Sequence, residues 1–171
     1  MLVPPTRSVP FMSRSIFTSA SNLMQCTPLA RDGQFFLALA AAPLILLLMT
    51  WLWPAWSAGI RPDVRLALSM VLWQPLLEEL LFRGAIQGRL AALGWARHRL
   101  AGLSISNWLA TILFALAHLV YHAPLWATSV ILPSLVFGYF RERYDRVYPA
   151  ILLHAIYNGS YLAIGALSNT T

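Results

Sequence analysis

Three separated apolar stretches of this chain carry polar side chains about one helical turn apart. The stretches are PLLEELLFRG, FALAH and HAIYN, and their candidate functional residues are Glu78, Glu79, Arg83, Phe114, His118, His154 and Asn158. An ionisable side chain at the centre of a bilayer costs roughly 2.5–3.5 kcal/mol on insertion scales. We therefore expect these side chains to meet in one buried site that water can reach.

The two adjacent glutamates of the first stretch should have different surroundings. Glu79 and Arg83 are four residues apart, so they share a helical face and can form a carboxylate–guanidinium pair that offsets much of the cost of burial. Glu78 is turned by about 100° from Glu79, and a free carboxylate of this kind can serve as a general base. A purely structural ion-pair cluster is the alternative, and the identity of the base stays open between the two glutamates.

The other two stretches offer groups that could assist a reaction. His154 and Asn158 share a helical face, and both can donate hydrogen bonds to a developing oxyanion. Phe114 lies one turn before His118. Taken singly, His118 could be an ordinary packing residue, and the His154–Asn158 pair could simply join two helices by hydrogen bonds. Together, the three stretches favour a catalytic site.

The composition is that of a membrane protein. Of 171 residues, 58% are hydrophobic and 11% are charged, and the mean hydropathy is +0.64, whereas a soluble domain is nearer 25% charged. The twelve basic residues are all arginines, and most lie in short loops beside apolar spans. The net charge of +6 is therefore better explained by membrane topology than by nucleic-acid binding. A single cysteine, Cys26, excludes an internal disulfide and a cysteine-rich metal site.

The apolar spans predict an all-α fold, a polytopic transmembrane bundle of about five membrane spans. The predicted spans are residues 35–53, 64–90, 103–120, 125–140 and 148–167. Pro133 is expected to kink the fourth span. Residues 1–33 should form a flexible N-terminal extension and residues 34–171 the transmembrane domain.

Arginines orient the predicted spans. Three lie in the N-terminal segment, three in the loop before residue 103 and three in the run RERYDR at residues 141–146, which we expect to be a solvated loop. Only Arg61 and Arg65 lie on the other side. By the positive-inside rule, the N-terminus is cytoplasmic and the C-terminus lies outside. His98 and His122 fall in predicted loops and have no evident partner.

The three stretches also resemble the motifs of a known family. EELLFR fits the pattern EExxxR, FALAH fits FxxxH and HAIYN fits HxxxN, in that order on successive spans. Over residues 64–167 the chain resembles the CAAX protease and bacteriocin-processing family, which includes the type II CAAX prenyl endopeptidases. It is shorter than the eight-helix members and looks like a compact form, such as those of the JDVT-CTERM type.

This resemblance implies an intramembrane endopeptidase of the bacterial cytoplasmic membrane. Its substrate would be a membrane-embedded or membrane-anchored protein, such as a lipidated protein or one with a sorting signal, cleaved near its C-terminus. Glu78 would activate the attacking water, His118 would help to hold that water, and His154 and Asn158 would stabilise the oxyanion. Glu79 and Arg83 would support the glutamate helix.

Metal dependence is the main alternative within this family. Glu78, His118 and His154 could in principle ligate zinc, but the compact HExxH arrangement of zinc hydrolases is absent. We therefore expect a glutamate-type peptidase without a cofactor.

Two unrelated functions also fit part of the pattern. Acids and histidines within membrane spans can form the proton relay of a transporter or channel, although the chain has no inverted repeat of the kind common in transporters. A non-catalytic bacteriocin-immunity or scaffold protein could share the fold. A Ser-His-Asp hydrolase is not supported, because no serine lies in a nucleophile motif.

Overall fold

The computed structural model describes residues 29–52 and 63–168. In chain order, the elements are η2 (Leu29–Arg31), α1 (Gly33–Leu52), α2 (Val64–Leu68), η4 (Ser69–Trp73), α3 (Gln74–Glu79), η5 (Leu80–Gln87), α4 (Gly88–Ala92), η6 (Gly94–Arg97), β1 (Arg99–Leu100), β2 (Leu103–Ser104), α5 (Ile105–His118), α6 (Pro124–Ser129), α7 (Ile131–Tyr144) and α8 (Tyr148–Ser168). Apart from the short β1–β2 hairpin, the described residues confirm the predicted all-α fold.

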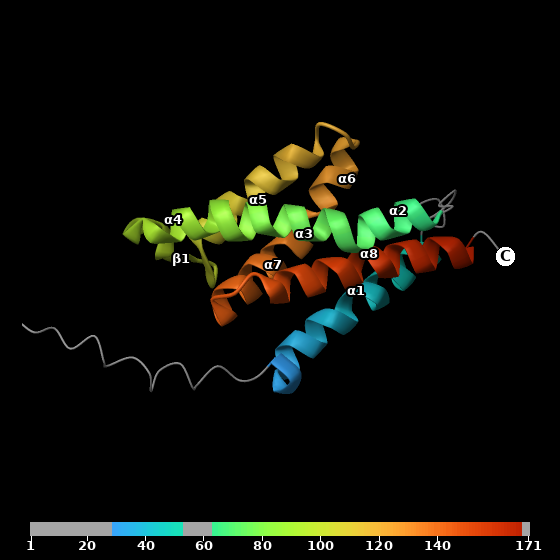
Figure 1. Ribbon diagram of the computed structural model, residues 1–171, viewed down its shortest axis with the longest axis horizontal. Coiled ribbons are helices and arrows are strands. Elements are labelled where there is room, and N and C mark those ends of the chain that lie inside the picture. The colour runs from blue at the N-terminus through green and yellow to red at the C-terminus, as the bar shows by residue number, and fades with distance from the viewer. Residues whose placement is uncertain (1–28, 53–62, 169–171) are drawn as a thin grey trace, which may run out of the picture.

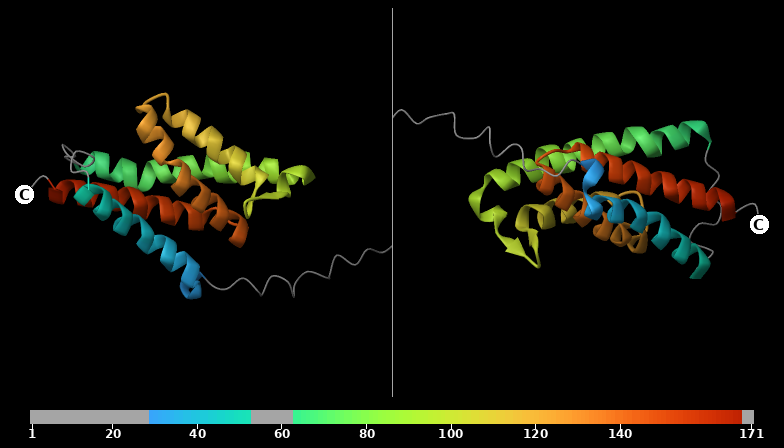
Figure 2. Two further views of the ribbon diagram at one scale, coloured as in Figure 1. Left: turned by 180° about the vertical axis from the view of Figure 1, so that it is seen from behind. Right: turned by 90° about the horizontal axis from the view of Figure 1, so that it is seen from below.

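The helices form one bundle built around α8. The segments α2 to α4 follow one another without a break, so residues 64–92 form one long helix of about 44 Å at 1.5 Å per residue. Helix α8 lies between this long helix and α1 (Figures 1 and 2), and α7 packs against both α8 and α5. The long helix, which carries Glu78, Glu79 and Arg83, also contacts α5 and α8, which carry the other candidate residues.

Two helices are long and apolar enough to cross a membrane. They are residues 33–52 and 148–167, and the outer face of α1 exposes large apolar side chains such as Leu37, Leu44 and Trp51. A helix that is apolar on all sides is typical of a membrane span. Helix α5 is apolar but has only 14 residues, about 21 Å. The helical membrane character agrees with the prediction, whereas the count of five spans stays a prediction.

The fourth predicted span is divided in the structure. Helix α6 ends at Ser129, and α7 starts at Ile131 and continues to Tyr144. Pro133 explains the position of the break, because its ring would collide with the carbonyl of Ser129 in a continuous helix, whereas proline is tolerated in a first turn. The expected distortion by Pro133 is therefore present, and it divides residues 125–140 into two helices separated by Val130 rather than only bending one helix.

The predicted solvated loop at residues 141–146 is also wrong in its first part. Residues 141–144 form the last turn of α7, and Tyr144 is buried there. The helix ends at Asp145, which has a positive φ of 49°. Asp and Asn adopt this left-handed conformation more readily than most residues do.

The third predicted span starts later than expected, because a hairpin precedes it. Residues 99–104 pair as β1 and β2 around Ala101 and Gly102, which both have positive φ, as a type I′ turn requires. Ser104 then caps α5 by accepting a hydrogen bond from the backbone N–H of Asn107. The hairpin and the cap set where α5 begins.

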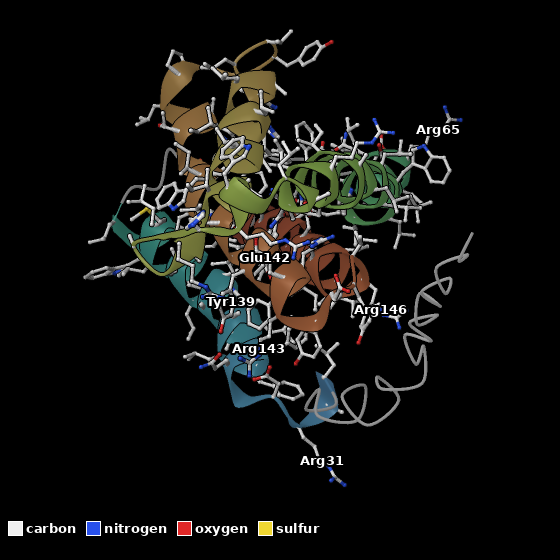
Figure 3. The ribbon with its side chains drawn as sticks, turned by 90° about the vertical axis from the view of Figure 1, so that its left-hand side faces the viewer. Arg31, Arg65, Tyr139, Glu142, Arg143 and Arg146 are labelled. Carbon is white, nitrogen blue, oxygen red and sulfur yellow. The ribbon has the colours of Figure 1, made fainter. Side chains whose placement is uncertain are left out.

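One end of the bundle gathers the start of α1, the α4–α5 connection and the end of α7 (Figures 1 and 3). Asp32 lies there between α1 and α7, with Arg143 Nε at 2.7 Å and the hydroxyl of Tyr144 at 2.5 Å from its Oδ2. The Tyr144 hydrogen bond and then the Arg143 guanidinium lower the pKa of Asp32 to about 2. Most of the predicted flexible extension, residues 1–28, lies outside the described residues. Its last part is structured, because these contacts anchor Asp32.

Candidate active site

The Glu79–Arg83 pair forms the buried centre of the bundle. Arg83 Nε donates a hydrogen bond to Glu79 Oε2 at 3.0 Å, and both side chains are 0% exposed. Arg83 Nη2 donates to the hydroxyl of Ser134 on α7 at 2.8 Å, and the guanidinium carbon lies 5.3 Å from the ring centroid of Phe114 on α5. The arginine thus joins three helices, as a paired buried charge must do to offset its desolvation.

His154 brings α8 to the same pair. Its Nδ1 lies 3.0 Å from Glu79 Oε1, and a carboxylate accepts this hydrogen bond from Nδ1–H. The imidazole stacks on Phe137 at a centroid distance of 5.0 Å and is buried. With Nδ1 occupied, Nε2 is the nitrogen that can interact with another group.

Glu78 differs from its neighbour, as its helical position predicts. Its side chain is 30% exposed, and its Oε2 lies 3.7 Å from His154 Nε2, which is beyond a normal hydrogen-bond distance. Glu79 is therefore committed to two protein partners, and Glu78 keeps a carboxylate that water can reach.

Phe114 and His118 form the wall beside this cluster. Their ring centroids are 4.4 Å apart, and Phe114 lies 6.0 Å from His154. His118 Nδ1 lies 2.9 Å from the carbonyl oxygen of Phe114. Because the carbonyl can only accept, Nδ1 carries the proton and Nε2 of a neutral His118 is a hydrogen-bond acceptor.

His122 contradicts the expectation that it has no partner. Its ring lies 4.2 Å from the ring of Trp126 on α6, and His118 stacks on the same tryptophan at 6.1 Å. The ring contacts therefore continue from Phe114 and His118 on α5 to Trp126 on α6. His98 contradicts the same expectation, because its Nδ1 lies 2.8 Å from the carbonyl oxygen of Trp95, although the residue is exposed.

Asn158 lies one turn beyond His154 on α8 but makes a contact of its own. Its amide nitrogen donates to the carbonyl oxygen of Met70 at 2.8 Å. Met70 lies in a π-helical stretch just before Pro75, and such distortions are frequent near functional sites. A primary amide has two N–H donors, so one N–H of Asn158 remains for another acceptor.

The sequence patterns did not predict the polar side chains that form hydrogen bonds around the Glu79–Arg83 pair. Ser134 donates to Thr111 at 3.0 Å, and Thr111 donates to Asn107 at 3.4 Å. Gln87, one turn after Arg83, donates to the carbonyl of Gly138 and to Glu142. A signal was present, because Asn107, Thr111, Phe114 and His118 follow the spacing of one helical face.

The structure does not hold the zinc alternative's three residues in a ready-made ligand group. Among residues 29–52 and 63–168, no three His, Cys, Asp or Glu side chains are grouped so that they could hold a metal ion. The Nδ1 atoms of His154 and His118 are held by Glu79 and by a carbonyl oxygen, which leaves both Nε2 atoms open, as in many metal-binding histidines. Metal independence therefore stays a prediction.

The fold and this cluster are those of a helical membrane protein with a polar centre suited to hydrolysis. A family model described as type II CAAX prenyl endopeptidase Rce1-like matches residues 60–160. The match covers more than half of the chain and all three motifs, so the chain belongs to this family. No curated protein and no solved structure matches the chain.

Proposed function

We propose that the protein is a glutamate-type intramembrane endopeptidase that cleaves a peptide bond near the C-terminus of a membrane-associated protein. One observation carries the proposal. Both carboxylate oxygens of Glu79 have a protein partner, Arg83 and His154, whereas the neighbouring Glu78 side chain is partly exposed beside the same histidine. Membership of the family supports the reaction class.

Glu78 is the general base of the proposed reaction. Its carboxylate takes a proton from a water molecule, and the water oxygen attacks the carbonyl carbon of the scissile bond. The C–N bond then breaks, and the proton passes from Glu78 to the leaving amine. The Nε2 acceptor of His118 suits a second hydrogen bond to the attacking water.

His154 and Asn158 are the proposed oxyanion donors. Glu79 holds the Nδ1 side of His154, so the imidazole is oriented with Nε2 toward Glu78, and Nε2–H of the protonated ring can donate to the oxyanion. Asn158 contributes its remaining N–H. Removing one such donor typically lowers kcat by about 10²–10³.

The remaining parts of the proposal concern topology and substrate. A cytoplasmic N-terminus is supported by the start of α1, the α4–α5 connection and the end of α7, which lie toward one end of the bundle (Figure 1) and carry Arg31, Arg97, Arg99, Arg141 and Arg143. This distribution agrees with the positive-inside rule, and we propose five spans. We place the protein in the bacterial cytoplasmic membrane, with residues 34–171 as the protease domain. Lipidated proteins and proteins with a C-terminal sorting signal, as in the JDVT-CTERM type, are the proposed substrates.

The decisive experiment compares Glu78→Gln with wild type. Both are expressed at matched levels in cells, and the termini of membrane proteins are identified by mass spectrometry. We expect trimmed C-termini that accumulate only with wild type, because loss of a general base costs about 10²–10⁴ in rate. Asp145→Asn is the control, since it removes one carboxylate that is 92% exposed and far from the cluster.

Three further outcomes test the alternatives. Trimming that disappears with a zinc chelator would restore the metal-dependent reading of the same protease. Equal trimming by a folded Glu78→Gln protein would contradict the proposed base. No trimming by either protein would contradict a protease and favour the immunity, scaffold or proton-coupled transporter alternatives, none of which produces new termini.

A further inference from the structure

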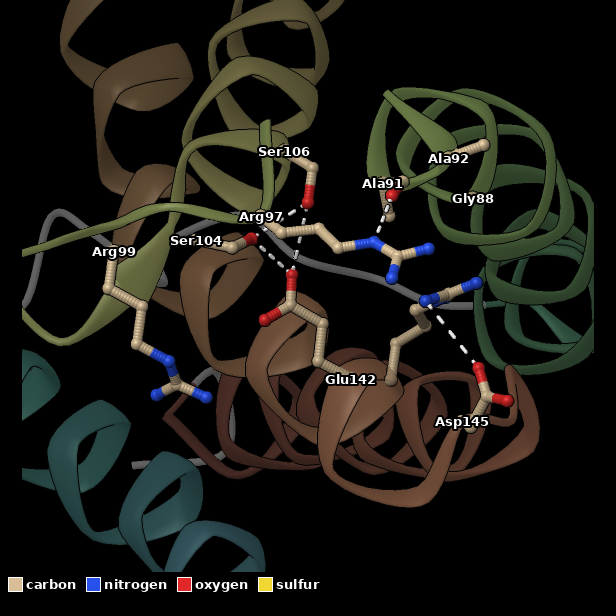
Figure 4. Close-up of a pocket in the computed structure, with 10 residues that line it drawn as sticks. Gly88, Ala91, Ala92, Arg97, Arg99, Ser104, Ser106, Glu142 and Asp145 are labelled. Carbon is tan, nitrogen blue, oxygen red and sulfur yellow. Dashed lines mark hydrogen bonds and ion pairs between the residues drawn. The ribbon is translucent and has the colours of Figure 1, made fainter. Parts of the chain in front are cut away.

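A second polar site lies at the arginine-rich end of the bundle, about 15 Å along the long helix from Glu78. It is a pocket of about 460 Å³ between α4, the hairpin and the end of α7 (Figure 4). Its charged lining residues are Arg97, Arg99, Arg141, Glu142 and Asp145. None of these residues takes part in the proposed catalytic cluster.

Two of the arginines approach the same face of α4 from different elements. Arg97 reaches across the pocket, and its Nε donates to the carbonyl oxygen of Ala91 at 2.6 Å (Figure 4). Arg141 Nη2 lies against Gly88, 3.3 Å from the position that a Cβ would occupy. Because Gly88 and Ala91 are three residues apart and share one face of α4, both arginines lie against the same side of this helix.

The described part of the chain gives these cations no close carboxylate. Arg97 is exposed, and its side-chain hydrogen bond goes to a backbone carbonyl. The ion-pair contact of Arg141 is with Asp145 at 3.8 Å, and that aspartate is 92% exposed, so solvent screens it. The terminal N–H groups of both guanidinium groups are therefore available to an acceptor from outside the chain.

Glu142 does not supply that acceptor. Its Oε1 accepts hydrogen bonds from Ser104, from Ser106 at 3.2 Å and from Gln87 at 2.8 Å. This oxygen therefore accepts from neutral donors that link the pocket lining to the buried centre, and neither Arg97 nor Arg141 is among these partners. With three arginines and two acids, the lining carries a net positive charge.

We infer that the pocket binds a phosphate group between Arg97 and Arg141; Arg99 also lines the pocket, but its Nη1 donates to the carbonyl oxygen of Gly102 in the hairpin. Phosphate oxygens accept the paired N–H bonds of a guanidinium fork, and basic pockets between membrane helices are typical headgroup sites. Trp95 and Tyr148, both exposed near this end, are residue types that favour the membrane interface. An anionic phospholipid headgroup and a small soluble phosphate ester share the required chemistry.

The test uses the full-length protein purified in a neutral detergent, with thermal unfolding as the readout. The probes are short-chain phosphatidylglycerol, short-chain phosphatidylcholine and glycerol 3-phosphate. The variants are Arg97→Gln and Arg141→Gln. Arg89→Gln is the matched control, because Arg89 is exposed on the same α4 and does not line the pocket.

We expect phosphatidylglycerol to raise the Tm of wild type and of Arg89→Gln, with an apparent affinity roughly ten- to a hundredfold weaker in each pocket variant. A matching response to glycerol 3-phosphate would identify a soluble phosphate ester as sufficient, and a response to the lipid alone would identify the headgroup source. Equal responses to phosphatidylcholine, or equal losses in Arg89→Gln, would overturn the proposal. So would the absence of any response in wild type. Because the two variants alter different elements, misfolding of one leaves the other to decide.

Discussion

The buried centre around Glu79 and the arginine pocket on α4 show two ways of treating charge in one bundle. In the centre, Arg83 is 0% exposed and has a carboxylate, a hydroxyl and an aromatic ring as partners from three helices. In the pocket, Arg141 has a single ion-pair contact, at 3.8 Å to an exposed aspartate, and Arg97 is exposed. One guanidinium nitrogen of each region, Arg83 Nη1 and Arg141 Nε, is buried without a hydrogen-bond partner among the described residues. The regions therefore differ in the close carboxylate that Arg83 has and the pocket arginines lack, and the proposed phosphate would supply that missing anion.

The same contrast exists between the two glutamates. Glu79 pairs with Arg83 and orients the imidazole of His154 through a hydrogen bond. Glu78 has a contact of 3.7 Å with His154 Nε2, which is longer than a hydrogen bond. A carboxylate that holds other side chains in place needs hydrogen-bond partners on both oxygens. A carboxylate that exchanges protons with water needs an oxygen without a protein partner. The comparison can be tested by substitutions that treat the two regions in the same way.

The largest effect is expected from Arg83→Met compared with Arg97→Met. Loss of Arg83 leaves Glu79 as a buried charge without its main partner and should destabilise the fold by about 3–5 kcal/mol. Arg97 is exposed, so its replacement should change the stability by at most about 0.5 kcal/mol. Thermal unfolding in detergent measures the stability of both variants. Equal losses of stability would contradict the expectation that Arg83 is a structural residue of the buried centre and Arg97 is not.

A smaller effect is expected where α5 and α7 meet beneath the centre. A Cβ on Gly138 would lie 1.9 Å from Oδ1 of Asn107, so Gly138→Ala should cost about 1–3 kcal/mol through overpacking. Gly94→Ala is the control, because nothing lies within 4 Å of that position. A Gly138→Ala protein as stable as wild type would show that Asn107 can move without weakening its hydrogen-bond chain through Thr111 and Ser134 to Arg83.

The smallest effect is expected at Asp32, which belongs to neither region. Its pKa is lowered from 3.8 to about 2 by Tyr144 and Arg143, so its stabilisation is fully present above pH 4 and is lost as the pH falls toward 2. The exposure of Arg143 limits the size through solvent screening. Thermal unfolding of wild type and Asp32→Asn from pH 6 to pH 2.5 should show a gap that narrows below pH 4. A gap independent of pH would contradict the ionic contribution.

Local patterns in the sequence predicted much of the candidate site. The i, i+4 spacing of Glu79 and Arg83 predicted their ion pair, and the 100° offset of Glu78 predicted its separate environment. These predictions succeed because helical geometry places side chains at fixed angles whatever surrounds the helix. The catalytic roles of the residues stay predictions.

Contacts between helices could not be predicted in the same way. The Glu79–His154 hydrogen bond joins residues 75 apart, and the Arg83–Ser134 bond joins residues 51 apart. The pocket on α4 was missed because the run at residues 141–146 reads as a charged loop, although its first residues complete α7. Single-sequence patterns carry no register between helices, so they cannot say which polar faces meet.

The sequence by itself determined that the chain is helical, that it belongs in a membrane and that three polar helical faces must be buried together. These conclusions rest on composition and on the cost of a charge in lipid, which act on each segment separately. Only the tertiary structure decided that Glu79 is saturated and Glu78 is not, and that two arginines face a shared cavity. Those outcomes depend on the packing of α4, α5, α7 and α8, because the environment of a charged side chain is set by groups from several helices at once.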